Sequence, residues 1–363
     1  MARDWSQLPN DLLTLIGQKV NKLNDLYCFL SVCKSWRETN IHFPQSPWLI
    51  FFNSEIETRT NRRQKNENPP LCGLVGLGEQ NVHELDLPEP KEIQCVGSTG
   101  NFLILKEGDL RITLFNPFSR VATHLPPVES LRFFGKLATR NTDGVVMAIV
   151  RKVVSMLLVA RPGDTYWTEV RKCVHILHDI ILYKNRFYTV NDQGEVTTWD
   201  VGLSPKVPIK DMQLSMALRD SLGAEKNYLV EWLGELLLVI KYRMHKNRKR
   251  RFKVYQLNSR SLKWNELLNL RNYSLFLGKN TSVSVLASGS IKENCIYYTD
   301  DRDFKSDKSW GHDMGVFNME GNDIQPHYND SASTNHHSLP VWIIPSSKSE
   351  AGIRKRKWSS LLS

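Results

Sequence analysis

The apolar positions of the chain follow one period in the first forty residues and another after about residue 70. Near the N-terminus they recur at steps of three and four residues, which gives one stripe of a helix, at Leu12, Leu13, Ile16 and Val20. Pro9 and Asp11 suit the first turn of that helix, because proline is tolerated there and an acidic side chain is stabilised by the helix dipole. A second stripe follows Asn24-Asp25, at Leu26, Phe29, Leu30 and Cys33. The pattern predicts two or three short helices.

These helices form too small a unit to bury a self-sufficient core, so we expect their apolar face to dock on another surface. Their sequence, LPNDLLTLIGQKVNKLNDLYCFLSVCKSWRE from Leu8, combines Leu-Pro, Asp-Leu-Leu and Val-Cys-Lys-x-Trp-Arg in order. This combination resembles an F-box over about residues 3–40. An ordinary N-terminal helical hairpin, with the same residues in its core, is the alternative.

The F-box resemblance implies binding to a Skp-type adaptor, which ties such proteins to a cullin scaffold. Aliphatic and aromatic anchors at helical spacing supply most of the affinity in helix-in-groove contacts. Carried over by position, the adaptor contact and the small core behind it comprise Leu8, Pro9, Leu12, Leu13, Ile16, Leu26, Phe29, Val32, Cys33 and Trp36.

After residue 70, short β-branched and aromatic runs alternate with Gly, Asn, Asp and Pro turns. Five strand–turn–strand segments overlay on one another, with turns near 116, 161, 200, 258 and 320. That spacing fits one four-stranded propeller blade each, and residues 72–87 offer a sixth hairpin. Trp167 and Trp264 take matching places in their hairpins, where we expect them to pack between blades. A pair of irregular β-sandwiches is the competing architecture.

Motifs in the second half also carry a family resemblance, at Cys295–Asp301, Asp313–Asn318 and Leu339–Pro345. These motifs are similar to those of plant F-box proteins with a KIB-type (kelch-like) β-propeller domain. The fold class so implied is a small all-α F-box followed by a mainly-β domain, a β-propeller with six blades. The predicted domains are an F-box over 3–42, a linker over 43–70, a propeller that binds substrate over 71–345 and a basic tail over 346–363.

Composition agrees with a folded chain, because 41% of the 363 residues are hydrophobic and 24% are charged. The start has no signal-peptide pattern, and no apolar stretch is long enough to span a bilayer. The six cysteines show no paired spacing, which favours reduced thiols. We therefore expect a soluble protein of the nucleus and/or cytoplasm, without membrane contact.

Two basic clusters stand out against a net charge of +10. They are candidate nuclear-localisation signals, and consist of Arg248, Lys249, Arg250 and Arg251 within the run 241–253, and of Arg354, Lys355, Arg356 and Lys357. The first also fits a solvated hairpin tip. Neither cluster accompanies an aromatic platform or a recognition helix, so nucleic acid is not the expected partner.

Candidate chemistry is sparse. Cys173, His175 and His178 would point to different sides of a strand, so they do not predict a metal site. Asp300, Asp301 and Asp303 fit a carboxylate site, but we expect them in an acidic turn at the end of a strand. No nucleophile, base and orienting group assemble, so we predict no catalytic site, no metal and no cofactor.

The F-box resemblance implies that the chain is the substrate-recognition subunit of an SCF-type E3 ubiquitin ligase, which presents an unknown target protein for ubiquitination and proteasomal degradation. The alternatives are a β-propeller enzyme, which a tightly held cofactor would reveal, and a basic nucleic-acid-associated protein, which steep salt dependence would reveal.

Overall fold

A computed structural model describes residues 5–19, 29, 32–37, 39, 47–52, 72–77, 83–85, 93–108, 111–117, 121–128, 133–151, 154–202, 210–215, 221, 223–242, 252–299, 301, 313–325 and 340–344. The chain divides into two compact units, with the division between Gln45 and Ser46. The first unit is helical where it is described, and the second is built of strands.

The helical unit contains a 3₁₀ turn, η1 (Trp5–Gln7), and two helices, α1 (Asn10–Gln18) and α3 (Lys34–Arg37). Pro9 occupies the N-cap of α1, where its carbonyl accepts a hydrogen bond from the Leu13 amide at 3.1 Å. Asp11 lies in the first turn, as the helix dipole favours. The start of the first predicted helix is therefore confirmed.

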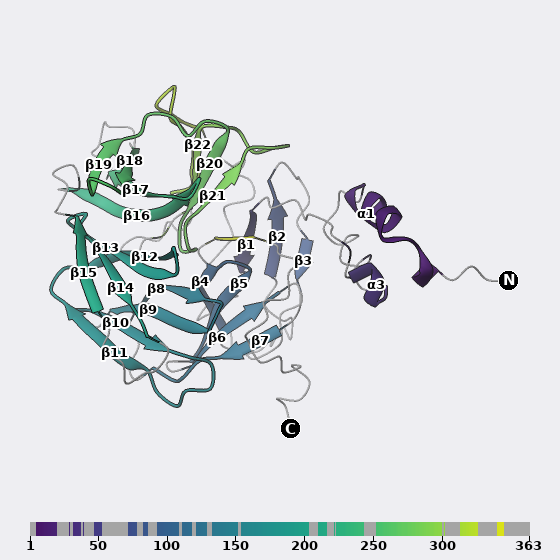
Figure 1. Ribbon diagram of the computed structural model, residues 1–363, viewed down its shortest axis with the longest axis horizontal. Helices are drawn as coiled ribbons and strands as arrows, with labels where there is room; N and C mark the ends of the chain where they lie inside the picture. The colour runs from purple at the N-terminus through teal and green to yellow at the C-terminus, as the bar shows by residue number, and fades with distance from the viewer. Residues whose placement is uncertain are drawn as a thin grey trace, which may run out of the picture. The chain divides into compact units, whose positions relative to one another are not determined.

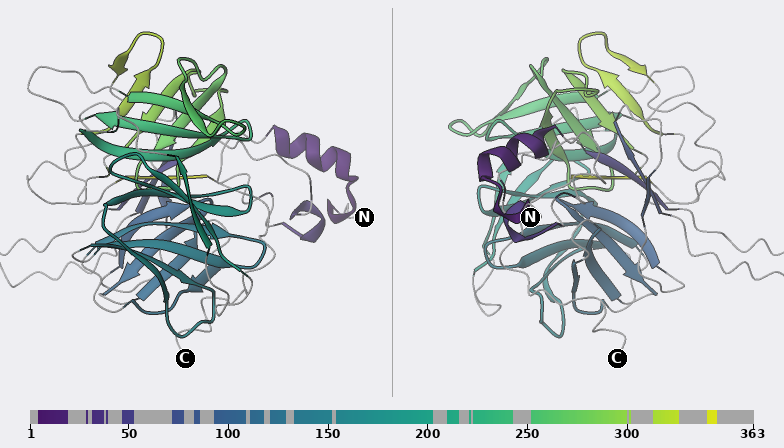
Figure 2. Two further views of the ribbon diagram at one scale, coloured as in Figure 1. Left: turned by 60° about the vertical axis from the view of Figure 1, so that its left-hand side comes forward. Right: turned by 90° about the vertical axis from the view of Figure 1, so that its right-hand side faces the viewer.

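The strand unit consists of six antiparallel or mixed sheets arranged around a central axis (Figure 1). Figure 2 shows the same sheets from two further directions. Blade 1 contains β25 (Val341–Ile343), β1 (Trp48–Phe52), β2 (Cys72–Gly76) and β3 (His83–Leu85). Blade 2 contains β4 (Ile93–Thr99), β5 (Phe102–Glu107), β6 (Arg111–Asn116) and β7 (Val121–His124). Blade 3 contains β8 (Phe133–Arg140), β9 (Val145–Arg151), β10 (Ser155–Ala160) and β11 (Thr168–Cys173).

The other half of the ring follows the same plan. Blade 4 contains β12 (Leu177–Tyr183), β13 (Arg186–Asn191), β14 (Val196–Asp200) and β15 (Lys210–Ser215). Blade 5 contains β16 (Ala224–Trp232), β17 (Glu235–Tyr242), β18 (Phe252–Asn258) and β19 (Lys263–Glu266). Blade 6 contains, in spatial order, β21 (Val283–Leu286), β20 (Tyr273–Leu277), β22 (Cys295–Tyr298), β23 (Gly315–Asn318) and β24 (Asp323–Gln325). The six-bladed propeller is confirmed.

The outer hairpins owe their recurrence to local turn chemistry. Asn258 accepts hydrogen bonds from the amides of Arg260 and Ser261 at 3.0 Å each, through its side-chain oxygen. Asn318 accepts from Glu320 at 2.9 Å in the same way. Because an asparagine side chain that bonds to the next amides stabilises a turn, the repeated Asn marks the same hairpin in two blades.

Apolar side chains fill the spaces between adjacent blades. Between blades 2 and 3, for example, Ile104 and Leu137 pack in one cluster, and the partly buried Trp167 packs against it. The Trp167 indole also donates to the carbonyl of Pro126 at 2.7 Å. The predicted packing role of Trp167 is confirmed, and Trp264 packs against the cluster between blades 4 and 5.

The ring closes with strands from both ends of the propeller sequence. Trp48 and Ile50 of β1 pair with Ile343 and Val341 of β25. The prediction of a linker over residues 43–70 is therefore wrong for Trp48–Phe52, because this run of five apolar residues forms a strand and carries the buried Leu49 and Ile50.

Blade 6 departs from the predicted pairing. The order of the strand-like runs in the sequence predicts that residues 283–286 and 295–299 form a pair of neighbouring strands. In the structure β20 lies between β21 and β22 and runs parallel to β22. The prediction for this blade is wrong because β20 pairs with β21 on one side and with β22 on the other, so the chain crosses over β20 between them.

The connection from β20 to β21 lies at the centre of the ring, where it contacts several blades (Figure 1). Within this central segment, residues 278–282, the Thr281 amide donates to the Ser98 carbonyl at 2.8 Å in blade 2. The Thr281 hydroxyl donates to the Leu137 carbonyl at 3.2 Å in blade 3. A Cβ on Gly97 would lie 2.5 Å from the Lys279 carbonyl oxygen, so glycine is needed there. The central segment therefore joins blade 6 to blades on the other side of the axis.

Candidate functional site

Helix α1 of the helical unit presents an apolar face to solvent. Leu13 is completely buried, whereas Leu12, Leu15 and Ile16 are 48%, 56% and 42% exposed. Positions 12, 15 and 16 lie on one side of a helix, because they are three and four residues apart. We call Leu12, Leu15 and Ile16 the exposed face of α1.

A small aromatic cluster and two hydrogen bonds join other parts of the helical unit. The rings of Phe29 and Trp36 lie 4.5 Å apart, and the Trp36 indole donates to the Trp5 carbonyl at 3.0 Å. The Ser35 hydroxyl donates to the Ser6 carbonyl at 3.0 Å, which fixes α3 to η1.

The structure thus divides the ten residues that the F-box resemblance implied. The exposed ones are Pro9, Leu12, Ile16 and Val32; the partly buried ones are Leu8, Cys33 and Trp36; the buried ones are Leu13 and Phe29. Leu26 lies outside the described residues. Sequence reasoning missed Leu15, although its position three residues after Leu12 could have revealed it.

At the propeller axis, charged side chains from four blades meet in the interior. The Lys136 ammonium lies 3.0 Å from Asp179 Oδ1, and both side chains are almost completely buried. Asp179 Oδ2 accepts hydrogen bonds from the Leu229 amide at 3.0 Å and the Ser282 hydroxyl at 3.2 Å. One carboxylate therefore joins blades 3, 4 and 5 to the central segment.

A second cluster surrounds Asp301. Its Oδ2 accepts the Tyr228 hydroxyl at 2.8 Å, and its Oδ1 lies 3.7 Å from the Lys241 ammonium. Lys241 lies 3.1 Å from Asp313 as well. Burial alone would raise the pKa of Asp301, but the lysines at 226, 241, 136 and 279 outweigh it and hold that pKa well below its usual range. Burial and then Asp301 raise the pKa of Tyr228 well above its ordinary value.

We call the two clusters around Asp179 and Asp301 the central charge network. It contradicts two expectations from the sequence. Lys241 was grouped with the basic run 241–253, but its side chain is fully buried. Asp301 was expected in an acidic turn at the end of a strand, as a solvated group, yet it is 3% exposed and paired with lysine. Asp300 and Asp303 lie outside the described residues. Because each carboxylate has a cationic or hydrogen-bonding partner inside the protein, the network ties blades together.

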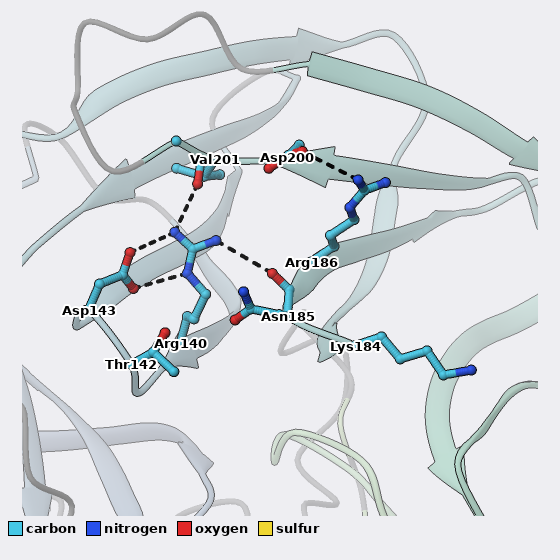
Figure 3. Close-up of a pocket in the computed structure, with 9 residues that line it drawn as sticks. Arg140, Thr142, Asp143, Lys184, Asn185, Arg186, Asp200 and Val201 are labelled. Atoms are coloured by element: carbon cyan, nitrogen blue, oxygen red, sulfur yellow. Dashed lines mark hydrogen bonds and ion pairs between the residues drawn. The ribbon is translucent and has the colours of Figure 1, made fainter.

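An open pocket of about 370 Å³ lies between blades 3 and 4 (Figure 3). Arg140 forms two hydrogen bonds with Asp143, at 2.9 and 2.7 Å, and donates to the Val201 carbonyl at 2.8 Å. Partial burial acts to raise the pKa of Asp143, but Arg140, the Val145 amide and Arg161 together outweigh it and lower that pKa. Arg186 and Asp200, on the other wall, are 3.5 Å apart and half exposed. The buried arginine serves to join the two blades.

A family model, described as KIB1-4 beta-propeller, matches residues 74–318. This is more than half of the 363 residues. The chain belongs to the KIB1-4 beta-propeller family.

Relatives of this KIB1-4 propeller protein carry F-box names. "Putative F-box protein At5g55150" of Arabidopsis thaliana is 24% identical, over 90% of this chain and 94% of the relative. "F-box protein SKIP23" of the same plant is 24% identical, over 78% of this chain and 80% of the relative. The predicted resemblance to plant F-box proteins with a KIB-type propeller is confirmed, and the kelch-like assignment stays a prediction.

Solved structures resemble the KIB1-4 propeller protein more distantly. TolB from Acinetobacter baumannii matches at a TM-score of 0.48 and 10% identity, over 84% of this chain and 68% of TolB.

The two candidate histidines of the KIB1-4 propeller protein have separate partners. His178 is buried and accepts the Asn227 amide at 3.1 Å, whereas His175 is 3.7 Å from Asp192. Among the described residues, no three His, Cys, Asp or Glu side chains are placed to hold a metal. The basic clusters 248–251 and 354–357 lie outside the described residues. No helix in the described part of the chain is long and apolar enough to cross a membrane.

Proposed function

We propose that this protein is the substrate-recognition subunit of an SCF-type E3 ubiquitin ligase. The exposed face of α1 binds a Skp-type adaptor, the adaptor joins a cullin, and the propeller holds a target protein for ubiquitination and proteasomal degradation. The F-box names of its relatives, together with the apolar face on α1, support this function.

The role of the protein in this mechanism is positional and not catalytic. A target held on the propeller meets the recruited ubiquitin-conjugating enzyme at a high effective concentration, because both are bound to one assembly. Nothing in this role requires a cofactor of the chain itself. We further propose that the complex works in the nucleus and/or the cytoplasm, with the basic clusters 248–251 and 354–357 supporting import.

The exposed face of α1 is the observation that carries the proposal. Large aliphatic side chains in water are unfavourable, and fully burying an exposed one contributes about 1.5–3 kcal/mol. Leu12, Leu15 and Ile16 are about half exposed, so burying each of them in a partner contributes about half of that. Leu13 and Phe29 are already buried and hold the unit together, so the exposed residues are available to make the contact.

The test is adaptor binding by the full chain after co-expression with a plant Skp-type adaptor. Replacing both Leu12→Asp and Ile16→Asp places two carboxylates in the apolar contact, and we expect affinity to fall by at least about 100-fold, since about 2.8 kcal/mol suffices for that loss. The affinity is measured by surface plasmon resonance.

The matched control is Leu268→Asp, because Leu268 is an exposed leucine of the propeller, at 74%. It should bind the adaptor as the wild type does. Adaptor binding that survives in the Leu12→Asp/Ile16→Asp variant would refute the assignment.

A further inference from the structure

The open pocket between blades 3 and 4 lies where turns of the two blades meet (Figure 3). Blade 3 contributes Thr142 and Asp143 from the β8–β9 turn. Blade 4 contributes residues 184–186, at the β12–β13 turn, and residues 200–202, at the end of β14 and directly after it. Its volume of about 370 Å³ lies in the range of ligand pockets, which is about 300–1,000 Å³. We call it the inter-blade pocket.

Most acceptors in the wall of this pocket already receive a donor from the protein itself. The buried Arg140 donates to two backbone carbonyls, those of residues 201 and 185, at 2.8 and 3.5 Å. It also donates to both carboxylate oxygens of Asp143. Arg161 donates to the carbonyl of Gly202 at 2.8 Å. The hydrogen-bonding capacity that remains for a ligand therefore belongs mainly to exposed side chains.

The exposed side chains of the pocket offer more donors than acceptors. Arg186 contacts Asp200 from Nη2 to Oδ2 at 3.5 Å, and a guanidinium has five N–H donors, so most of them are left to solvent. Charge-assisted N–H···O bonds are about 2.7–2.9 Å long, which makes this contact a weak one. The side chains of Thr142 and Asn185 are exposed, and they form no hydrogen bond within the described part of the chain.

The backbone that carries Arg186 is already ordered. Tyr183 and Arg186 pair across a two-residue turn, in which Lys184 and Asn185 have φ values of 46° and 64°. Positive φ at both positions is typical of the type I′ turn, whose twist matches that of the two strands. Arg140 of blade 3 donates to this turn at the carbonyl of Asn185. A site that is ordered before binding avoids part of the entropy cost of binding.

Lys184 lies at the edge of the pocket and has contacts of its own. In Figure 3 its side chain extends away from Arg140, and its ammonium lies 4.9 Å from the centre of the Tyr183 ring. Glu235 of blade 5 attracts the same ammonium. We therefore assign Lys184 no contact with the ligand, which leaves Arg186 as the cation that faces it.

These donors favour a carboxylate over a phosphate group. Arginine binds both kinds of anion through two parallel N–H bonds. A phosphate group has up to two negative charges and three acceptor oxygens, and proteins usually recognise it with a cluster of arginines. Of the arginines around this pocket, Arg140 and Arg161 donate to its wall, and only Arg186 keeps most of its donors free. One guanidinium with two neutral donors matches the two oxygens of a carboxylate.

We propose that the inter-blade pocket binds an acidic side chain of the target protein. Arg186 holds the carboxylate, and Asn185 and Thr142 donate to it from blade 4 and blade 3. Asp200 competes with the ligand for Arg186, so binding replaces the 3.5 Å contact with shorter hydrogen bonds. This inference rests on the proposed function, because it assigns part of the surface that recognises the target.

The probe is a fluorescein-labelled peptide, Gly-Ser-Gly-Glu-Glu-Gly-Ser-Gly, whose affinity for the full chain is measured by microscale thermophoresis at low salt. Three counterparts carry glutamine, lysine or phosphoserine in place of the two glutamates. We expect the glutamate peptide to bind at least about 10-fold more tightly than the glutamine peptide, because only a carboxylate forms charge-assisted bonds with Arg186. This difference should shrink as the salt concentration rises.

Two variants of the pocket should change the affinity in opposite directions. Arg186→Ala should weaken binding of the glutamate peptide at least about 10-fold and remove its advantage over the glutamine peptide. Asp200→Asn should strengthen binding several-fold, because it removes the competing carboxylate. Arg260→Ala and Glu266→Gln are the matched controls, since they remove exposed charges of the same two signs from blade 5. Both controls should bind the peptide as the wild type does.

Four results would overturn the proposal. The first is an affinity for the glutamate peptide that is equal in Arg186→Ala and the wild type. The second is a glutamine or lysine peptide that binds as tightly as the glutamate peptide. The third is a phosphoserine peptide that binds more than about 10-fold more tightly, which assigns the pocket to phosphate. The fourth is free glutarate that binds as tightly as the peptide, which assigns the pocket to a small acid.

Failure of this proposal is distinguishable from failure of the proposed function. Leu12→Asp/Ile16→Asp, which should lose the adaptor, should keep the wild-type affinity for the glutamate peptide. Arg186→Ala should bind the adaptor as the wild type does. Loss of the preference for glutamate with adaptor binding intact would refute the assignment of the inter-blade pocket alone.

Discussion

At the scale of single residues, the buried carboxylate of Asp301 makes the fold sensitive to acid. Its pKa is lowered in the folded state, so its charge stabilises the fold above the unfolded pKa, and this stabilisation is lost as the pH falls toward the folded pKa. Below about pH 4 the wild type should lose about 1.4 kcal/mol per pH unit through this group. Urea unfolding at several pH values should give a smaller acid slope for Asp301→Asn than for the wild type. The exposed Asp200→Asn variant should keep the wild-type slope.

The same interior charges could not be predicted from neighbouring residues. Lys241 belongs to a run of basic residues along the chain, but its partner Asp301 lies about sixty residues later. Local composition favours solvation for such a lysine, and only the packing of blades 5 and 6 explains its burial. By contrast, the start of α1 at Pro9 and the turn at Asn258 depend on adjacent residues alone, and both were predictable.

At the scale of elements, the close contact between Gly97 and the central segment should make the stability of the fold sensitive to substitution at Gly97. Gly97→Ala should push the Lys279 carbonyl away, because the new Cβ would lie 2.5 Å from its oxygen. We expect a loss of about 1–3 kcal/mol in the free energy of unfolding, which is the usual cost of overpacking. Gly108→Ala is the control, since its Cβ meets no atom within 4 Å and only the left-handed backbone, with a φ of 54°, opposes it. Chemical denaturation compares the two, and an equal effect would contradict the steric explanation.

Among the elements, the outer hairpins were predictable and the order of strands in blade 6 was not. A hairpin depends on its own turn and on alternation in its two strands, which are visible in about fifteen residues. The insertion of β20 between β21 and β22 depends on a crossover, and no local signal marks it. The exposed face of α1 was predictable in part. The helical spacing predicted Leu12 and Ile16 as members of an apolar stripe, but the motif did not include Leu15.

At the scale of the whole molecule, the pairing of β1 with β25 predicts how the chain responds to truncation. A stop codon after Leu339 removes β25, which exposes the edge of β1 and the cluster around the buried Trp342. We expect this chain to lose cooperative thermal unfolding and to aggregate, as unpaired strand edges favour. A stop after Pro345 keeps β25 and should unfold as the full chain does. A cooperative transition at the same temperature in the shorter chain would show that β25 is dispensable.

The number of blades followed from counting hairpins, while the closure of the ring did not. The apolar run 48–52 looked like part of a connecting segment, because its partner β25 lies almost three hundred residues later. Pairings over such distances leave no periodicity in the sequence between them. The proposed function of the helical unit rests on a motif that the sequence shows and on the exposure of Leu12, Leu15 and Ile16, which only the three-dimensional fold determines.

The pairing of β1 with β25 also determines when blade 1 can be completed during translation. The ribosome makes the helical unit and β1 first, and it makes the closing strand only after every other blade. During most of translation the edge of β1 therefore stays unpaired, while the N-terminal helices have already left the ribosome. Under the proposed function, an adaptor that is present at the ribosome would meet α1 long before the propeller is complete, so that binding of the adaptor would precede the folding of the propeller.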